Sequence, residues 1–334
     1  MAFDLPTVWA ALIAFAVLMY VVLDGFDLGI GILFPFVRHE KRRDVMINSI
    51  APVWDGNETW LVLGGGGLYA VFPLAYSLLL TAFYAPLTAM LLALIFRGVA
   101  FEFRFKDPRH RRWWDWGFSG GSILAAFTQG VVLGTFIQGV AVDGRSYAGG
   151  WFDWLTPFSL FTGIALVAGY GLLGATWLVM KAEGGLQAQC RRLAVGFLAA
   201  VLVALAVVSL WTPLIHEGVR GRWFVWPNIA FLAPVPLLGA ASAFGLFAAV
   251  RKGADYWPFL FALALFVFSY LGLAISFYPY IVPPSVTVHQ AAGPDESLGF
   301  LLVGALILLP LILAYTAYSY WVFRGKVRAG ESYH

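Results

Sequence analysis

Long apolar stretches separated by short polar segments make up almost the whole chain. A helix needs about 20 consecutive apolar residues to cross a hydrocarbon core of roughly 30 Å. Read with that window, the sequence predicts nine transmembrane helices. Their approximate ranges are 8–36, 51–72, 76–103, 115–140, 155–181, 190–213, 226–250, 257–281 and 297–323. The second is the least regular, because the polar stretch WDGNETW lies in its first half.

Basic residues give an independent test of this count. Most of the 21 lysines and arginines follow the first, third, fifth, seventh and ninth ranges. Only Arg145, Arg220 and Arg222 lie in the alternate loops. Because basic loops stay in the cytoplasm, this alternation predicts a periplasmic N-terminus and a cytoplasmic C-terminus. Adding or removing one helix in the middle would destroy it.

Composition agrees with a polytopic, all-α membrane protein. Hydrophobic residues make up 61% of the chain and charged residues 12%, whereas a soluble domain is about half apolar and a quarter charged. The loops are too short to hold a soluble domain, so residues 1–334 are expected to form one integral membrane domain. No basic patch with interleaved aromatic residues indicates nucleic-acid binding.

Two carboxylates interrupt the first apolar range, in VVLDGFDLGIGILF. Asp24 and Asp27 are three residues apart, which places both on one helical face. Ionisable residues inside a membrane helix are costly and are functional candidates by default. They form either a protonatable or ion-binding face toward the bundle interior or a shallow, hydrated helix end. The apolar turn that follows before Arg38 favours the first interpretation.

The same spacing recurs in WDGNETW, where Asp55 and Glu58 have Asn48 and Asn57 nearby as hydrogen-bond partners. Two close carboxylates in a poorly solvated site disfavour double ionisation, so a proton could be held there, as a relay requires. The alternative is a capping cluster at an interfacial helix start. Apolar neighbours favour the relay for Asp55, and both interpretations stay open for Glu58.

Arg97 lies in apolar sequence, LIFRGVAFEFRF. A permanent guanidinium charge there needs an anionic partner, such as a carboxylate or a cofactor propionate, unless the side chain snorkels to the interface. Asp115 opens the fourth range among Trp113, Trp114 and Trp116. Tryptophans in this position are typical of an interfacial belt, so they add little evidence of function.

Four consecutive glycines, residues 64–67, permit either a broken helix or close helix packing, and packing is favoured. Acids in broken helices are also what proton- or sodium-coupled secondary transporters use. Such a transporter is one alternative function. An assembly scaffold without chemistry of its own is another.

Metal and haem ligands are not expected in this chain. The single Cys190 excludes an internal disulfide and a cysteine-rich cluster. No histidine lies in the middle of a predicted span, where a transmembrane haem ligand is expected. The five are His39, His110, His216, His289 and His334.

Together these motifs resemble subunit II of the cytochrome bd family of quinol oxidases. The resemblance rests on LDGFDLGIGIL (23–33), RRDVMINSIAPVWDGNETWL (42–61), FRGVAFEFR (96–104), WWDWGF (113–118), SFYPYIVPPS (276–285) and YTAYSYWVFRGKV (315–327). It covers essentially the whole chain, and the order of the motifs makes it specific. The short length is similar to the cyanide-insensitive branch of that family.

The resemblance implies a heterodimer in the bacterial inner membrane. Its subunit I would bind haem b and haem d and carry the quinol-oxidising loop, and the complex would reduce O₂ to water with cytoplasmic protons. Some relatives hold a structural quinone in subunit II, and a small single-helix accessory subunit is common. The implied fold has two four-helix bundles, expected at residues 1–140 and 186–334, and a peripheral helix at 150–185.

The resemblance also assigns roles to particular residues. Asp55 would belong to a proton path near the subunit interface. Asp27, Arg97 and Asp115 would support that path or haem assembly, with Asp24 beside them and Glu58 as an auxiliary. Catalytic and iron-binding residues are not expected in this chain.

Overall fold

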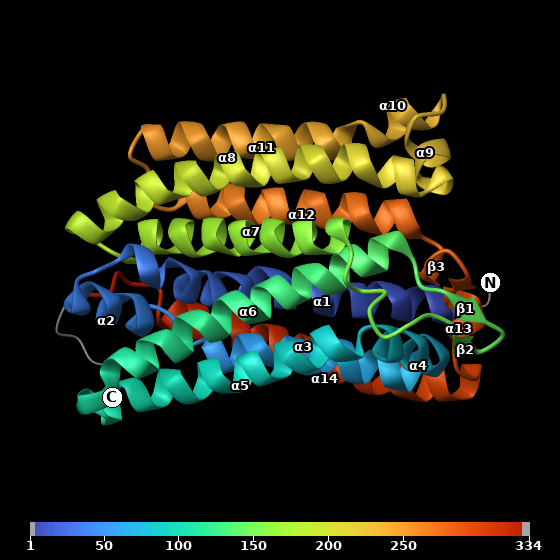
Figure 1. The fold of residues 1–334 in the computed structure, drawn as a ribbon, viewed down its shortest axis with the longest axis horizontal. Coiled ribbons are helices and arrows are strands. Elements are labelled where there is room, and N and C mark those ends of the chain that lie inside the picture. Colours follow the sequence, from blue (N-terminus) through green and yellow to red (C-terminus); the bar gives the residue numbers. More distant parts are fainter. Residues whose placement is uncertain (1–3, 329–334) are drawn as a thin grey trace.

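The structure, a computed structural model, describes residues 4–328 as a stack of long, nearly antiparallel helices (Figure 1). Most basic residues gather at one end of the stack, on the left in Figure 1, together with α2; we call this the basic end. The helices are α1 (Leu5–Leu33), η1 (Phe34–Phe36), α2 (Glu40–Asn48), α3 (Trp54–Val71), α4 (Pro73–Ala82), α5 (Tyr84–Lys106), η2 (Pro108–His110), α6 (Arg111–Gln138), α7 (Pro157–Lys181), α8 (Gly184–Ile215), α9 (Glu217–Trp223), α10 (Asn228–Leu232), α11 (Pro234–Arg251), α12 (Trp257–Phe277), α13 (Val288–Ala291) and α14 (Asp295–Val322).

Four short strands lie at the end opposite the basic end. β1 (Val142–Asp143) pairs antiparallel with β2 (Ser146–Tyr147), and β3 (Tyr280–Val282) pairs antiparallel with β4 (Val286–Thr287). These hairpins connect helices and do not form a sheet core.

Within residues 4–328, eight helices are long and apolar enough to cross a membrane: α1, α5, α6, α7, α8, α11, α12 and α14. The chain is therefore a multi-pass membrane protein. The second predicted span corresponds to α3, which is not among the eight because WDGNETW and the glycine run dilute its apolar character. At 1.5 Å per residue its 18 residues still extend about 27 Å beside α1. The ninth crossing and the orientation of the termini stay predictions.

The third predicted range, 76–103, is not one helix. α4 ends at Ala82 and α5 begins at Tyr84, with Phe83 between them at φ −104° and ψ 14°. Pro86 lies in the first turn of α5, four residues after Ala82. A proline without an N–H suits the first turn of a helix and interrupts a continuing one, so the chain makes two helices here.

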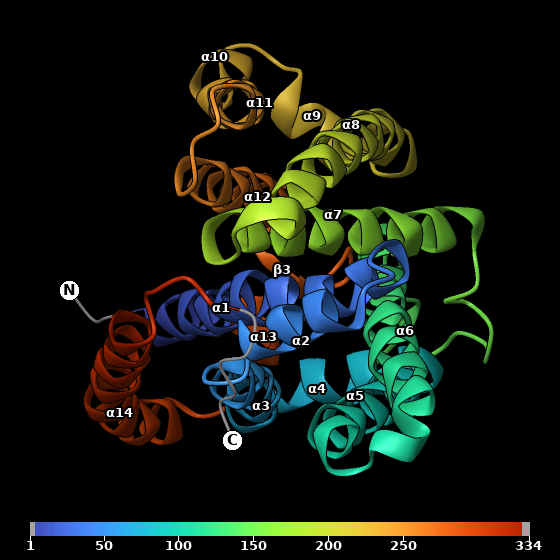
Figure 2. The same cartoon turned by 90° about the vertical axis from the view of Figure 1, so that its left-hand side faces the viewer.

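The long helices form two groups in the end view (Figure 2). One contains α1, α3, α5 and α6, and the other contains α7, α8, α11 and α12. α14 lies at the edge, with its main contacts on α1 and α3. α14 is thus the long helix at the periphery of this structure, whereas the resemblance implied a peripheral helix at residues 150–185.

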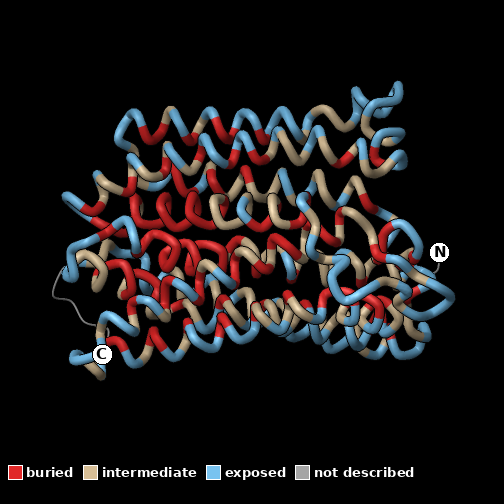
Figure 3. Tube along the Cα trace, viewed as in Figure 1, coloured by how far each residue is buried: buried red, intermediate tan, exposed pale blue. Residues whose placement is uncertain are grey.

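Small residues explain why α7 lies inside. α7 packs against α1, α6, α8 and α12, and a run of its residues from Gly169 to Val179 is buried. By contrast, α14 presents large apolar side chains outward along most of its length, and only Leu298 is buried. Buried residues accordingly gather in the middle of the stack, along α7 and the basic-end half of α1 (Figure 3).

The two groups meet where α1 crosses α7. A Cβ atom added to Gly29 would lie 2.1 Å from the carbonyl oxygen of Tyr170, and one added to Gly174 would lie 2.4 Å from the carbonyl carbon of Gly29. The backbones therefore touch directly, which only glycine at both positions allows. This is the small-residue packing that membrane helices use in place of a hydrophobic driving force.

The glycine run 64–67 serves packing and leaves α3 unbroken. Cβ atoms added to Gly64 and Gly67 would lie 3.3 Å from Val17 and 3.2 Å from Ile13, both on α1. Gly65 and Gly66 have nothing within 4 Å of such an atom and face outward. The helix break that an ion-coupled transporter would use is not found in α3.

We predict that Gly29→Ala lowers the melting temperature and the yield of folded protein. The added methyl group overlaps the α7 backbone, which cannot move aside as a side chain would, so the cost should reach about 3 kcal/mol or more. Gly196→Ala on α8 is the matched control, because nothing lies within 4 Å of its added Cβ atom. Equal melting curves for the two variants in detergent would contradict the close α1–α7 contact.

Candidate functional site: a buried arginine among carboxylates

Arg97 lies at the centre of a polar cluster inside the first group of helices. Its side chain is 1% exposed, and its Nη1 atom lies 3.2 Å from Oδ1 of Asp24 and 3.4 Å from Oε2 of Glu58. Asp24 and Arg97 are each nine residues from the basic end of their helix, which corresponds to a depth of about 13 Å. The guanidinium also lies 5.8 Å from the ring of Trp54. Arg97 therefore has carboxylate partners and does not snorkel.

Asp27 joins this cluster through α3 and α14. The Asn57 side-chain amide donates to Oδ2 of Asp27 at 2.7 Å, and the Tyr320 hydroxyl donates to Oδ1 of Asn57 at 2.7 Å. Asp24, Asp27 and Asn57 are all buried. The pair Asp24 and Asp27 thus faces the bundle interior, and the peripheral α14 is tied to it.

A second chain of hydrogen bonds begins one turn from Asp24. Tyr20 precedes Asp24 by four residues, and its hydroxyl accepts a hydrogen bond from the Gln129 amide at 2.7 Å. The Gln129 carbonyl oxygen accepts one from the Tyr170 hydroxyl at 2.8 Å. α6 and α7 therefore contribute polar groups to the same region. Sequence reasoning missed these residues, because uncharged polar side chains do not stand out in apolar helices.

The cluster holds more acid than base. Asp24 and Glu58 contact one guanidinium, and Asp27 adds a third carboxylate one turn from Asp24. Three negative charges near one positive charge in an apolar slab are unfavourable unless protons are bound. Several buried atoms also make no hydrogen bond within the described residues: Oδ1 of Asp27, and Nε and Nη2 of Arg97. Orphaned groups of this kind suit a site that takes up protons or water.

Asp55 is not part of this cluster. It lies on the outward face of α3 and is exposed, and its backbone oxygen accepts a hydrogen bond from the Thr59 hydroxyl at 3.0 Å. Glu58, three residues later, is the carboxylate of this pair that reaches Arg97, with its side chain 29% exposed. The structure therefore joins Asp24, Asp27, Glu58 and Arg97, and leaves Asp55 at the surface of the isolated chain.

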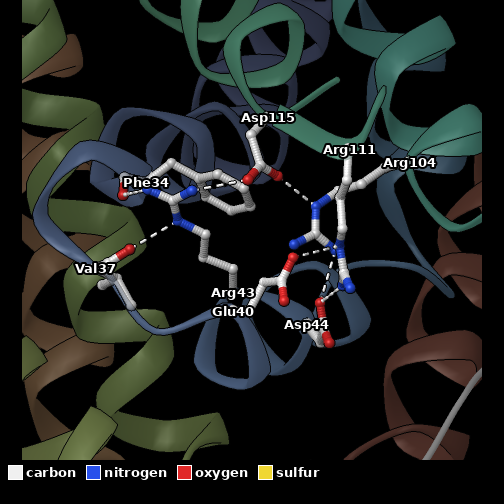
Figure 4. A network of polar contacts seen from close by, with 8 residues as sticks. All are labelled: Phe34, Val37, Glu40, Arg43, Asp44, Arg104, Arg111 and Asp115. Carbon is white, nitrogen blue, oxygen red and sulfur yellow. Dashed lines mark hydrogen bonds and ion pairs between the residues drawn. The ribbon is translucent and has the colours of Figure 1, made fainter. Parts of the chain in front are cut away.

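Asp115 belongs to a separate ionic cluster at the basic end (Figure 4). It accepts from Nη1 of Arg43 at 2.7 Å and from Nε of Arg104 at 2.5 Å. Arg104, fully buried, also donates to Asp44 at 2.7 Å, and Arg111 donates to the same Asp44 oxygen. Arginine suits this role because its planar fork presents several donors in fixed directions.

The ionic cluster also fixes the turn between α1 and α2. Arg43 donates from Nε to the Val37 carbonyl at 2.7 Å and from Nη2 to the Phe34 carbonyl at 3.2 Å. The Phe34 carbonyl lies in η1, where it also accepts from the Val37 amide, and Val37 is the first residue after η1. Arg104 follows Arg97 by seven residues, or two helical turns, so its burial on the same face of α5 was a signal available in the sequence.

The four described histidines lie outside the middle of the long helices. His39 precedes α2, His110 ends η2, His216 follows α8 with its Nε2 atom against the Ile137 carbonyl, and His289 lies in α13. His334 lies outside the described residues.

Comparison with known proteins gives the family. The model of the family described as cytochrome bd terminal oxidase subunit II matches residues 5–323. The chain belongs to this family. The cytochrome bd-I ubiquinol oxidase subunit 2 of Escherichia coli strain K12 is 32% identical, with 96% of this chain and 94% of that protein covered.

A second relative and a solved structure agree. The cytochrome bd ubiquinol oxidase subunit 2 of Bacillus subtilis strain 168 is 31% identical, with 98% of both proteins covered. A chain of the bd oxidase from Geobacillus thermodenitrificans has the same fold, with a TM-score of 0.77 and 17% identity over 96% of this chain and 99% of that one. The chain is therefore a component of a bd-type quinol oxidase complex.

We predict that Asp115→Asn destabilises this subunit by about 2–4 kcal/mol, because it leaves the buried Arg104 and the neighbouring Arg43 without their shared carboxylate. Thermal unfolding in detergent measures the effect. Glu102→Gln is the control, since its pair with Lys106 is exposed and should contribute no more than about 0.5 kcal/mol. Melting temperatures that agree between Asp115→Asn and the control would refute the structural role of the cluster.

Proposed function

We propose that this chain, as subunit II of a bd-type quinol oxidase, carries protons from the cytoplasm toward a haem-bearing subunit I. Membership of the family implies haem in the complex, and haem b and haem d are expected in subunit I. Reduction of O₂ to water consumes protons, so a path for them is needed. The observation that carries the proposal is the excess of buried carboxylates around Arg97.

Each member of the cluster has a distinct part in this path. Asp24 and Glu58 flank the Arg97 guanidinium and would exchange protons there, while Asn57 holds Asp27 by its Oδ2 atom. Arg97 keeps its charge at every physiological pH. It would therefore balance the carboxylate that remains ionised and let the other carboxylates bind and release protons.

The outward face of α3 supports a partner at this position. Asp55, Thr59, Val62 and Gly66 are exposed at helical spacing. A carboxylate and a hydroxyl facing lipid would be costly, whereas small residues let another helix approach closely. We infer that subunit I covers this face and that Asp55 and Glu58, three residues apart, form the protonatable stations between the two subunits.

The remaining parts of the proposal follow from the family. They are a heterodimer with subunit I in the bacterial inner membrane, surrounded by lipid, with quinol as the electron donor. The proposal also includes a small single-helix accessory subunit and a structural quinone bound by this chain.

The first test is whether the purified complex contains haem. We expect the complex that co-purifies with this chain from native membranes to contain a larger second polypeptide and to show haem bands in the reduced-minus-oxidised absorption spectrum. A colourless preparation that moves ions on its own in vesicles would refute the oxidase proposal and support a secondary transporter.

For the proton path, we predict that Asp55→Asn and Glu58→Gln each lower quinol oxidase turnover at least tenfold at unchanged haem content. Proton transfer by a positioned side chain typically contributes a factor of about 10²–10⁴, and amides cannot supply it. Oxygen consumption per haem measures the effect, and Glu296→Gln at the exposed start of α14 is the control.

The outcome separates three roles for these carboxylates. Reduced turnover per haem identifies a proton path. A lower yield of complex with normal turnover per haem would indicate a scaffold instead. If Asp55→Asn left both turnover and haem content intact, its assignment as a station would be wrong.

A further inference from the structure

A cavity of about 240 Å³ lies at the basic end, away from the Arg97 cluster and from the ionic cluster of Figure 4. Three separate parts of the chain line it: α2, the turn from α7 into α8, and the segment after α14. The lining residues are Lys41, Arg42, Val45, Glu183, Gly185, Leu186, Val327 and Arg328. Because these parts are far apart in sequence, the cavity is a product of the fold.

The lining is cationic at the rim and apolar beneath. The lining has one acidic residue, Glu183, and Lys41 and Arg42 by themselves carry more positive charge than it offsets. Val45 and Leu186 are buried and form the apolar part. A ligand with a compact anionic group and an apolar part matches this lining.

The Arg42 guanidinium is placed in the cavity by its neighbours. A Cβ atom at Gly185 would lie 2.5 Å from Nη2 of Arg42, so the missing side chain makes room for the guanidinium. Nη1 of Arg42 donates to Gln189 at 3.4 Å, a long hydrogen bond that orients the group without using its other donors. Lys41 beside it is exposed and lacks an ion pair within the described residues.

The segment after α14, which lines one side of the cavity, is fixed by two hydrogen bonds. The Val327 amide donates to the Lys181 carbonyl at 2.8 Å, and Lys326 donates to Oδ2 of Asp255 at 2.6 Å. The hydrogen bond from Lys326, together with the charges of Lys326 and Arg191, holds the pKa of the Asp255 carboxyl below its usual value. The ion pair of Lys326 and Asp255 therefore persists at neutral pH, and it holds the segment after α14 against the cavity.

The depth of the cavity points to the headgroup region of a bilayer. Lys181 ends one membrane helix and Gly184 begins the next, so the turn between them lies where apolar sequence gives way to water. Basic pockets between helices at the cytoplasmic surface bind anionic lipid headgroups. We propose that this cavity binds the phosphate group of an anionic phospholipid, with Lys41 and Arg42 as the principal cationic contacts.

Binding is tested on the purified complex by native mass spectrometry with added phosphatidylglycerol or phosphatidylcholine. We expect preferential retention of phosphatidylglycerol. Each cation near an anionic surface is worth about 1 kcal/mol, or roughly fivefold in affinity, so Lys41→Gln with Arg42→Gln should weaken binding roughly 25-fold. Arg251→Gln with Lys252→Gln is the control, a cation pair at the same end of the molecule but outside the cavity.

Three results would overturn a specific lipid site. If both double variants lose phosphatidylglycerol equally, the retention reflects general surface charge and the cavity has no part in it. If inorganic phosphate saturates the wild-type complex and displaces phosphatidylglycerol, the ligand is free phosphate and the lipid assignment fails. If the double variant does not assemble, Lys41→Gln alone, at an exposed position, should weaken binding roughly fivefold, and unchanged binding would overturn the proposal.

Discussion

The constraint on which the rest of the structure depends is the permanent charge of Arg97 inside an apolar layer. A guanidinium cannot release its proton, so its burial must be offset by carboxylates and hydrogen bonds. Asp24 from α1 and Glu58 from α3 meet it at 3.2 and 3.4 Å. Because these partners come from different helices, the charge fixes how α1, α3 and α5 lie relative to one another. The same requirement that holds the bundle together also concentrates acidic groups at one depth.

α5 carries two buried arginines, Arg97 and Arg104, two helical turns apart, and each is paired with carboxylates. Arg97 lies inside the membrane helices with carboxylates that exceed its charge, whereas Arg104 lies near the basic end in a cluster where acids and arginines alternate. The two clusters therefore differ in charge balance. In the balanced cluster, Asp44 and Asp115 are each paired with two arginines, which holds α2, α5 and α6 together. The unbalanced cluster, which lies deeper in the bundle, is the one to which our proposal assigns proton exchange.

Charge and hydropathy patterns predicted much of this fold, since loops rich in Lys and Arg alternate with apolar helices whatever the packing. They could not show the break at Phe83, which depends on Pro86 in the first turn of α5, or that α7 rather than α14 lies inside, which depends on the backbone contact at Gly29. Asp24, Asp27 and Arg97 stood out because charge is rare in apolar sequence. Which of Asp55 and Glu58 reaches Arg97 depends on the rotation of α3, which three-residue spacing does not determine.

The exposed features of the isolated chain are consistent with an incomplete assembly. α3 presents a carboxylate, a hydroxyl and glycines outward, which lipid would solvate poorly, whereas α14 presents leucine, isoleucine and aromatic side chains, which lipid solvates well. The two surfaces therefore suit different neighbours. A protein helix would cover α3, and acyl chains or an apolar helix would cover α14. Since Asp55 and Glu58 share α3 with the inner cluster, a partner that covers α3 would come within one turn of a continuous row of acids. The polar face of α3 is thus the surface where our proposal places both the partner subunit and the outer end of the proton path.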